Sequence, residues 1–180
     1  MKLRQRKFTT RDIDELLTWF TTERDVVQWA GAHLPYPLHR GHIRDLVFQH
    51  RGKTPAREVW CLCDETDTMI GHFQFGYSQR LRQATLGRIA INPAYRGRGL
   101  AAHLMPSAVA QAFSHDWVNR LELRVYDFNQ PAISAYERAG FVHEGTRRQS
   151  TPIEDEFWNT HVMSLLREEY SSFDKRTEQE

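Results

Sequence analysis

The segment with the clearest chemical potential is a glycine- and arginine-rich loop, Arg96-Gly97-Arg98-Gly99-Leu100-Ala101-Ala102. It follows a run typical of a strand and precedes a stretch with helical periodicity. Glycines let backbone N–H groups approach a ligand, a helix start favours negative charge, and arginines donate charge-assisted hydrogen bonds to phosphate oxygens. The loop therefore predicts binding of an anionic group, although a tight turn with solvated arginines would show the same pattern.

The same loop, taken as Gly97-x-Gly99-x-x-Ala102, also matches the dinucleotide-binding pattern. That pattern normally follows its strand directly and opens a chain with a second, substrate-binding half. Here residues 92–96 intervene, and no Gly-Lys-Ser/Thr sequence follows, as a triphosphate-binding loop requires. A regulator that binds ATP or NAD through this loop is therefore the less favoured interpretation.

A second block with chemical potential begins at Asn129 and ends at Gly140. Asn129 is expected to cap a helix whose first turn contains Pro131. Tyr136 shares a face of this helix with Ala132 and Gly140, because these residues recur every four positions. Its hydroxyl could take part in chemistry, or Tyr136 could be a core aromatic residue whose hydroxyl needs a partner.

Taken together, the two blocks resemble the GNAT superfamily of N-acetyltransferases and, more loosely, its ribosomal-protein and polyamine branch. Arg96, Gly99 and Ala101 match the acetyl-CoA signature Q/R-x-x-G-x-G/A, and the Asn129…Tyr136…Gly140-Phe141 block follows it. The run Ile89-Ala90-Ile91-Asn92-Pro93 stands where the family has its pantetheine-binding strand. The resemblance is specific from about residue 58 to 166 and vague over residues 1–55.

The resemblance implies direct transfer of an acetyl group from acetyl-CoA to a primary amine, on a small molecule or a protein N-terminus. It implies acetyl-CoA as co-substrate, no metal, and Tyr136 as the acid that protonates the departing thiolate. The backbone of the strand would hydrogen-bond the pantetheine arm, the loop would hold the pyrophosphate, and Asn129 would contact the amide arm. The residues expected to bind acetyl-CoA are Ile89, Ala90, Ile91, Arg96, Gly97, Arg98, Gly99, Leu100, Ala101, Ala102 and Asn129.

The sequence departs from the family at the position of the general base. Many members carry a glutamate on the strand before the loop, or five residues before the equivalent of Asn129. Residues 77–91 contain no carboxylate, and Arg124 occupies the second place. A water chain, His72 or a carboxylate elsewhere would have to accept the proton. This departure slightly favours the alternative of a non-catalytic acyl-CoA-binding sensor, which Tyr136 counts against.

Aromatic and imidazole side chains are the candidates for contacting the acceptor amine: Trp29, His33, Tyr36 and His72. His72 lies in a strand expected to border the acceptor pocket, and His33 lies in a loop expected at its rim. Either histidine could equally be structural. The nine histidines offer no convincing metal-ligand spacing, so no metal site is predicted.

Composition limits the classes of protein that remain. The 180 residues include 24 basic and 23 acidic ones, for a formal net charge of +1, which argues against a dedicated nucleic-acid binder. No run of about 18 apolar residues is present to span a membrane. Acidic residues follow the basic N-terminus where a signal peptide would be apolar. We therefore expect a cytoplasmic protein, as a monomer or homodimer.

Hydrophobic periodicity predicts the elements that must position these residues. A strand over residues 3–8 and three helical stretches come first, and the middle of the chain changes to strand-type runs. The expected strands after residue 55 are 59–63, 69–77, 84–91, 121–126, 141–145 and 157–166, and the expected helices there are 99–114 and 130–139. This order predicts an α/β fold: a single N-acetyltransferase domain over residues 1–170, with a GNAT-like mixed, mostly antiparallel sheet flanked by helices, and a polar C-terminal tail over 171–180.

Overall fold

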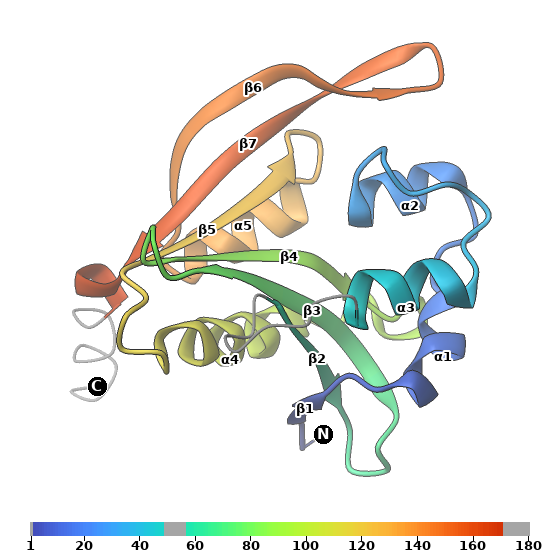
Figure 1. Cartoon of the computed structure of the whole chain (residues 1–180), viewed down its shortest axis with the longest axis horizontal. Helices are drawn as coiled ribbons and strands as arrows, with labels where there is room; N and C mark the ends of the chain where they lie inside the picture. Colours follow the sequence, from blue (N-terminus) through green and yellow to red (C-terminus); the bar gives the residue numbers. More distant parts are fainter. Residues whose placement is uncertain (1, 49–56, 171–180) are drawn as a thin grey trace.

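The computed structural model describes residues 2–48 and 57–170, and these form a seven-stranded sheet with the order β1-β2-β3-β4-β5-β7-β6 (Figure 1). The strands are β1 (Arg4–Lys7), β2 (Arg57–Cys63), β3 (Met69–Ser78), β4 (Gln83–Ile91), β5 (Arg120–Tyr126), β6 (Val142–Ile153) and β7 (Glu156–Leu166). The helices are α1 (Ile13–Leu17), α2 (Glu23–Ala30), α3 (Arg40–Phe48), α4 (Ala101–Phe113) and α5 (Gln130–Arg138), with 3-10 turns η1 (Thr10–Asp12) and η2 (Pro93–Tyr95). The tail predicted for residues 171–180 lies outside the described residues.

Each neighbouring pair of strands is antiparallel except β4 and β5, which run parallel. The parallel pair arises because α4 connects these two strands, whereas β2, β3 and β4 follow one another through short turns. The predicted α/β class with a mixed, mostly antiparallel sheet is confirmed. None of the helices in the described part of the chain is long and apolar enough to cross a membrane.

Two apolar clusters cover the two faces of the sheet. One joins α4 and α5 to β3, β4 and β5, and it contains Phe73, Leu86 and Leu104. The other joins α1, α2 and α3 to β2, and it contains Ile13 and Val26. Figure 1 correspondingly shows α4 and α5 on one side of the strands and α1–α3 on the other. The two layers therefore hold the sheet that carries the predicted site.

The longest departure from the predicted elements is β6, which was expected over residues 141–145 and extends from Val142 to Ile153. Its middle consists of exposed polar residues, so no alternation of apolar side chains marks it as a strand. β6 and β7 form a long hairpin with a register shift between Arg147 and Thr151. The hairpin reaches away from the sheet toward α2 (Figure 1).

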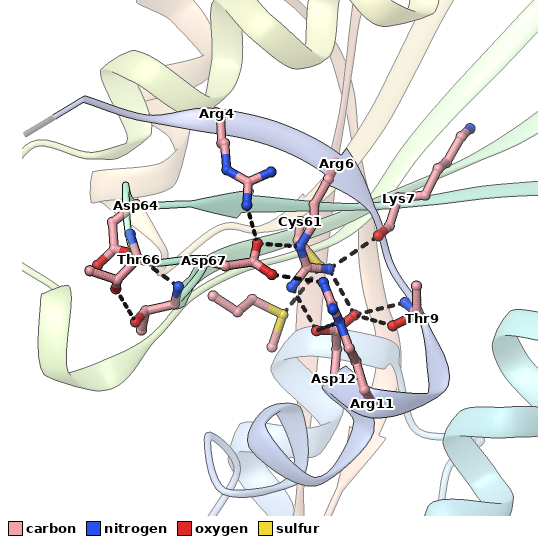
Figure 2. Close-up of polar contacts among 12 residues, drawn as sticks. Arg4, Arg6, Lys7, Thr9, Arg11, Asp12, Cys61, Asp64, Thr66 and Asp67 are labelled. Atoms are coloured by element: carbon pink, nitrogen blue, oxygen red, sulfur yellow. Dashed lines mark hydrogen bonds and ion pairs between the residues drawn. The ribbon is translucent and has the colours of Figure 1, made fainter.

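A polar network fixes the N-terminal strand to η1 and to the β2–β3 turn (Figure 2). Arg6 donates to the two carboxylate oxygens of Asp12 at 2.9 and 2.7 Å, and to Asp67 at 2.7 Å. Asp12 also accepts from the backbone N–H and the hydroxyl of Thr9. Burial alone would raise the pKa of Asp12, but the hydrogen bonds from Arg6 and Thr9 hold it below its ordinary value.

We expect Asp12→Ala to lower the free energy of unfolding by about 3 kcal/mol, because it leaves the guanidinium of Arg6 without its main partner. The side chains of Arg6 and Asp12 are only 14% and 6% exposed, so water replaces little of the lost contact. Arg11 bonds Asp67 in the same network but is 64% exposed. Arg11→Ala should therefore cost less than about 1 kcal/mol, and urea unfolding of both variants provides the comparison. Equal losses would contradict this account of the network.

Candidate active site

The parallel strands β4 and β5 separate part of the way along their length. Their pairing runs from Gln83 opposite Arg120 to Leu86 opposite Leu123 and then ends. β4 continues to Ile91, paired only with β3 on its other edge. Backbone N–H and C=O groups on the β5-facing edge of this part of β4 therefore have no strand partner and can bond an extended, amide-containing ligand.

A bulge in β4 accompanies this separation. The register between β3 and β4 shifts by one residue between the pairs His72–Ala90 and Gln74–Gly87. Arg88 lies in this interval with a φ of +48°, a backbone conformation uncommon for residues other than glycine. Its carbonyl oxygen accepts a hydrogen bond from Trp29 Nε1 at 2.8 Å. Bulges of this kind redirect a side chain and end strand pairing.

A cavity of about 760 Å³ lies against the free edge of β4 and the start of α4. We call it the loop-side cavity. It brings together most of the residues predicted to bind acetyl-CoA, which are Ile89, Ala90, Ile91, Arg96, Gly97, Gly99, Leu100, Ala101 and Asn129. The strand, the glycine loop and the second block, which are separate in sequence, thus line one space.

The loop geometry suits a phosphate-bearing ligand. Gly97 and Gly99 have φ angles of +76° and +72°, and a Cβ on either would meet no atom within 4 Å. Within residues 2–48 and 57–170, the N–H groups of Gly97, Arg98, Gly99 and Leu100 have no hydrogen-bond acceptor. Free N–H groups at the start of a helix, with open space in front of them, form an anion-binding site.

Two residues predicted to bind acetyl-CoA do not line the loop-side cavity. The guanidinium of Arg98 donates to the carbonyl of Ala94 at 3.3 Å and lies 5.2 Å from the ring centre of Tyr95. The N–H of Ala102 already donates to the carbonyl of Gly99 at 3.0 Å. The helix begins at Ala101, so Ala102 takes part in its first turn instead of presenting a free N–H.

A second cavity, of about 800 Å³, lies on the other side of the strand separation. Residues from the end of α2 and from β2 to β7 form its walls, and we call it the acceptor-side cavity. The residues that line both cavities are Gln28, Trp29, Ile89, Asn129 and Tyr136. The two spaces therefore meet around the predicted acid, Tyr136.

The side chain of Tyr136 is 7% exposed, and its hydroxyl has no hydrogen-bond partner within the described ranges. Burial raises the pKa of Tyr136 above its ordinary value, so the hydroxyl keeps its proton at neutral pH. Asn129 precedes α5 as expected, but its side chain makes no capping hydrogen bond. The predicted cap is therefore wrong in that respect, and the Asn129 amide remains available to a ligand in either cavity.

Of the four residues predicted to contact the acceptor, two line a cavity and two do not. Trp29 lines both cavities and His33 lines the acceptor-side cavity. Tyr36 lines neither, is 43% exposed, and donates its hydroxyl to the carbonyl of Thr21. His72 also lines neither: it is 1% exposed, and its Nδ1 lies 2.9 Å from the carbonyl oxygen of Arg88.

His72 is therefore placed to support the bulge of β4. Burial lowers its pKa to about 4, so it is neutral near pH 7. A carbonyl can only accept, so Nδ1 carries the proton and donates it to Arg88. The geometry gives His72 no path to an amine in the acceptor-side cavity.

Arginines in the acceptor-side cavity are the main residues that the sequence analysis missed. Arg57, Arg88 and Arg147 line it together with Arg124, which the analysis noted only as a missing glutamate. Basic residues on strands resemble an ordinary solvated face, and the walls come from elements far apart in the chain. Within the described part of the chain, no aspartate or glutamate is among the lining residues of this cavity.

The loop-side cavity has one carboxylate in its described wall, that of Asp25. It accepts hydrogen bonds from the backbone and hydroxyl groups of Thr21 and Thr22 at the start of α2. Burial by itself would raise the pKa of Asp25, but these hydrogen bonds lower it. Asp25 is thus engaged in helix capping. Across the described chain, no group of three or more histidine, cysteine, aspartate or glutamate residues could hold a metal ion.

A splayed parallel strand pair, an anion-binding loop at a helix start and a buried tyrosine between two cavities are the features of a CoA-dependent N-acetyltransferase. A model of the acetyltransferase (GNAT) family matches residues 12–141, and the chain belongs to this family. The predictions of this superfamily, of an acetyltransferase and of acetyl-CoA as co-substrate are confirmed.

The similar proteins have names that give different substrates. The chain is 27% identical over 129 residues to the L-amino acid N-acetyltransferase AaaT of Escherichia coli (strain K12), covering 70% of this chain and 79% of that protein. The spermidine N-acetyltransferase of Vibrio cholerae, solved with CoA and spermine, superimposes with a TM-score of 0.81 at 22% identity over 94% of this chain and 98% of that one. A putative phosphinothricin N-acetyltransferase gives a TM-score of 0.76 at 17% identity, over 92% and 98% of the two chains. The structural likenesses support the fold.

Proposed function

We propose that the protein transfers an acetyl group directly from acetyl-CoA, bound in the loop-side cavity, to a primary amine bound in the acceptor-side cavity. The observation that carries this proposal is that the two cavities meet at Tyr136 and Asn129. An amine entering from one side can therefore approach a thioester held on the other without a covalent enzyme intermediate.

The residues of the loop-side cavity have distinct tasks in this proposal. The free N–H groups of Gly97, Gly99 and Leu100 hold the pyrophosphate, and the unpaired edge of β4 from Ile89 to Ile91 hydrogen-bonds the pantetheine arm. Acetyl-CoA supplies the acetyl group as a thioester, whose sulfur leaves as a thiolate. Tyr136 donates its proton to that sulfur, and Asn129 hydrogen-bonds the amide arm.

The positive charge of the arginines in the acceptor-side cavity helps the acceptor amine to lose its proton. No carboxylate is among the described residues that line the acceptor-side cavity, so none of these residues is placed there as a carboxylate base. Its arginines disfavour a second cation beside them, which lowers the pKa of an entering ammonium group. We propose that the amine reaches the thioester in its neutral form and that water takes the remaining proton after attack.

The alternative function is a sensor that binds acyl-CoA without turnover, and the match to the acetyltransferase family does not favour it. A free-thiol assay with acetyl-CoA and a panel of amines separates the two functions, because only the enzyme releases CoA in an amine-dependent manner. Thermal unfolding with CoA, ATP and NAD in parallel should show stabilisation by CoA alone. Tight CoA binding without turnover of any amine would establish the sensor.

We further propose a cytoplasmic location and a monomeric or homodimeric state. The near-neutral net charge of +1 supports independence from nucleic acid. The acceptor amine belongs either to a protein N-terminus or to a small molecule. The shape and charge of the acceptor-side cavity are the basis for choosing between these two kinds of acceptor.

A further inference from the structure

The acceptor-side cavity has a strongly one-sided charge. Its lining includes His33 and four arginines, Arg57, Arg88, Arg124 and Arg147, and no carboxylate among residues 2–48 and 57–170. The arginines come from β2, β4, β5 and β6, so the fold gathers them from four strands. A cavity lined by charges of one sign concentrates ligands of the opposite sign.

Arg88 is the member of this group whose position is most specifically built. It lies at the bulge of β4 with a φ of +48°, and its carbonyl is held by Trp29 and His72. Its Nε is buried and has no hydrogen-bond partner within residues 2–48 and 57–170. Burial and the nearby charge of Arg57 lower the pKa of Arg88 to about 10. An anion beside this guanidinium would offset both effects and supply the acceptor for its donors.

Partners within the protein occupy the other arginines only in part. Arg57 donates to the carbonyl of Leu46 at 2.5 Å, and its remaining N–H donors have no acceptor among residues 2–48 and 57–170. Arg124 lies 3.7 Å from Glu122, beyond direct hydrogen-bond distance. Each guanidinium has five N–H donors in a planar fork that suits carboxylate and phosphate groups.

A bridge between α2 and the β6–β7 hairpin, two elements that contribute lining residues to this cavity, favours a small ligand. Arg24 on α2 forms ion pairs with Glu154 and Glu156 at the tip of the β6–β7 hairpin, at 3.2 and 2.6 Å. Beneath them, Val27 packs in one apolar cluster with Tyr126, Ile153 and Trp158. Figure 1 shows the hairpin reaching over to α2. Because this bridge ties α2 to the hairpin beside the cavity, we infer that it leaves less room for an extended peptide than for a small amine.

We propose that the acceptor is a small amine that also carries an oxyanion, such as a carboxylate or a phosphonate, and that Arg88 binds this oxyanion. This inference deepens the proposed function and rests on it. A polyamine would place its additional ammonium groups beside four guanidinium groups, with no carboxylate in the described lining to offset the repulsion, so polyamines should be poor acceptors.

Matched pairs of amines test this specificity with the wild-type protein. One arm compares an α-amino acid with its carboxamide, a second compares an aminoalkylphosphonate with the corresponding alkylamine, and further arms use spermidine and a short peptide with a free N-terminus. We expect kcat/KM to be at least about tenfold higher for the anionic member of at least one pair, because a charged hydrogen bond is lost in the other member. The pair with the larger ratio identifies which oxyanion is preferred.

Arg88→Gln tests the binding residue. We expect it to raise KM for the anionic acceptor at least about tenfold and to remove most of the preference for that acceptor over its uncharged partner, because any effect of Arg88 on amine protonation is common to both acceptors. Arg148→Gln is the matched control, because Arg148 neighbours Arg147 on β6, is exposed, and lines neither cavity. CoA affinity by calorimetry should be unchanged in both variants.

The outcomes separate this inference from the function on which it rests. Preference for spermidine, for the peptide or for the uncharged amines would overturn the inference and leave the acetyltransferase function standing. CoA binding without turnover of any amine would overturn the proposed function itself. An unchanged preference in Arg88→Gln would also overturn the inference. If Arg88→Gln fails to fold, Arg88→Lys replaces it, because lysine keeps the charge but lacks the planar fork of donors, and an unchanged KM for the anionic acceptor in that variant would overturn the inference.

Discussion

Tyr136→Phe is expected to lower turnover at saturating acetyl-CoA at least tenfold, because a positioned acid contributes a factor of about 10² to 10⁴. The change removes only the oxygen of a side chain that is otherwise buried in the core. The ring keeps its packing, and the hydroxyl has no partner in the described protein to lose. Fold stability and CoA affinity should therefore change little while the chemical step slows.

Rapid-mixing measurements must first show that chemistry limits the rate in the variant. Tyr77→Phe serves as the matched control, because Tyr77 is a partly buried tyrosine that lines neither cavity. It should retain wild-type turnover. Equal turnover in Tyr136→Phe and the wild type, with chemistry limiting in both, would remove Tyr136 from the role of general acid.

The part of the loop-side cavity formed by β4 and the glycine loop could be predicted from the sequence because it is local. The glycine loop occupies consecutive residues, and the strand before it and the helix after it each have a clear hydrophobic period. The structure differs from the prediction at two positions of the loop. Arg98 bonds back to Ala94, and Ala102 enters the first turn of α4, because helix hydrogen bonding begins one turn after Gly97.

The acceptor-side cavity could not be predicted in the same way, because tertiary contacts create it. Arg57, Arg88 and Arg147 are distant in sequence, and each alone resembles a solvated strand residue. The bulge that redirects Arg88 depends on hydrogen bonds from Trp29 and His72, which no local pattern reveals. His72 was predicted at this pocket from its strand alone. Its strand assignment is correct, but its side chain faces the layer of α1–α3, where it packs against Phe8 and Trp29.

Gly99→Ala is expected to weaken CoA binding at least about tenfold. A Cβ at Gly99 would project into space that is free of protein atoms, which is where the proposed pyrophosphate would lie. The φ of +72° also adds a conformational cost of about 1 kcal/mol for alanine, so part of any effect could come from strain in the loop. Calorimetry with CoA measures the affinity, and thermal unfolding of the ligand-free protein measures the strain.

Gly140→Ala separates these two contributions, because Gly140 has a comparable φ of +90° at the end of α5 and lines neither cavity. Its cost in stability should match or exceed that of Gly99→Ala, since its Cβ would also lie 3.4 Å from Leu165. Its CoA affinity should nevertheless equal that of the wild type. If Gly99→Ala loses stability but binds CoA normally, the phosphates lie elsewhere. If both variants lose affinity in proportion to their stability, the loop acts only through the fold and does not hold the ligand.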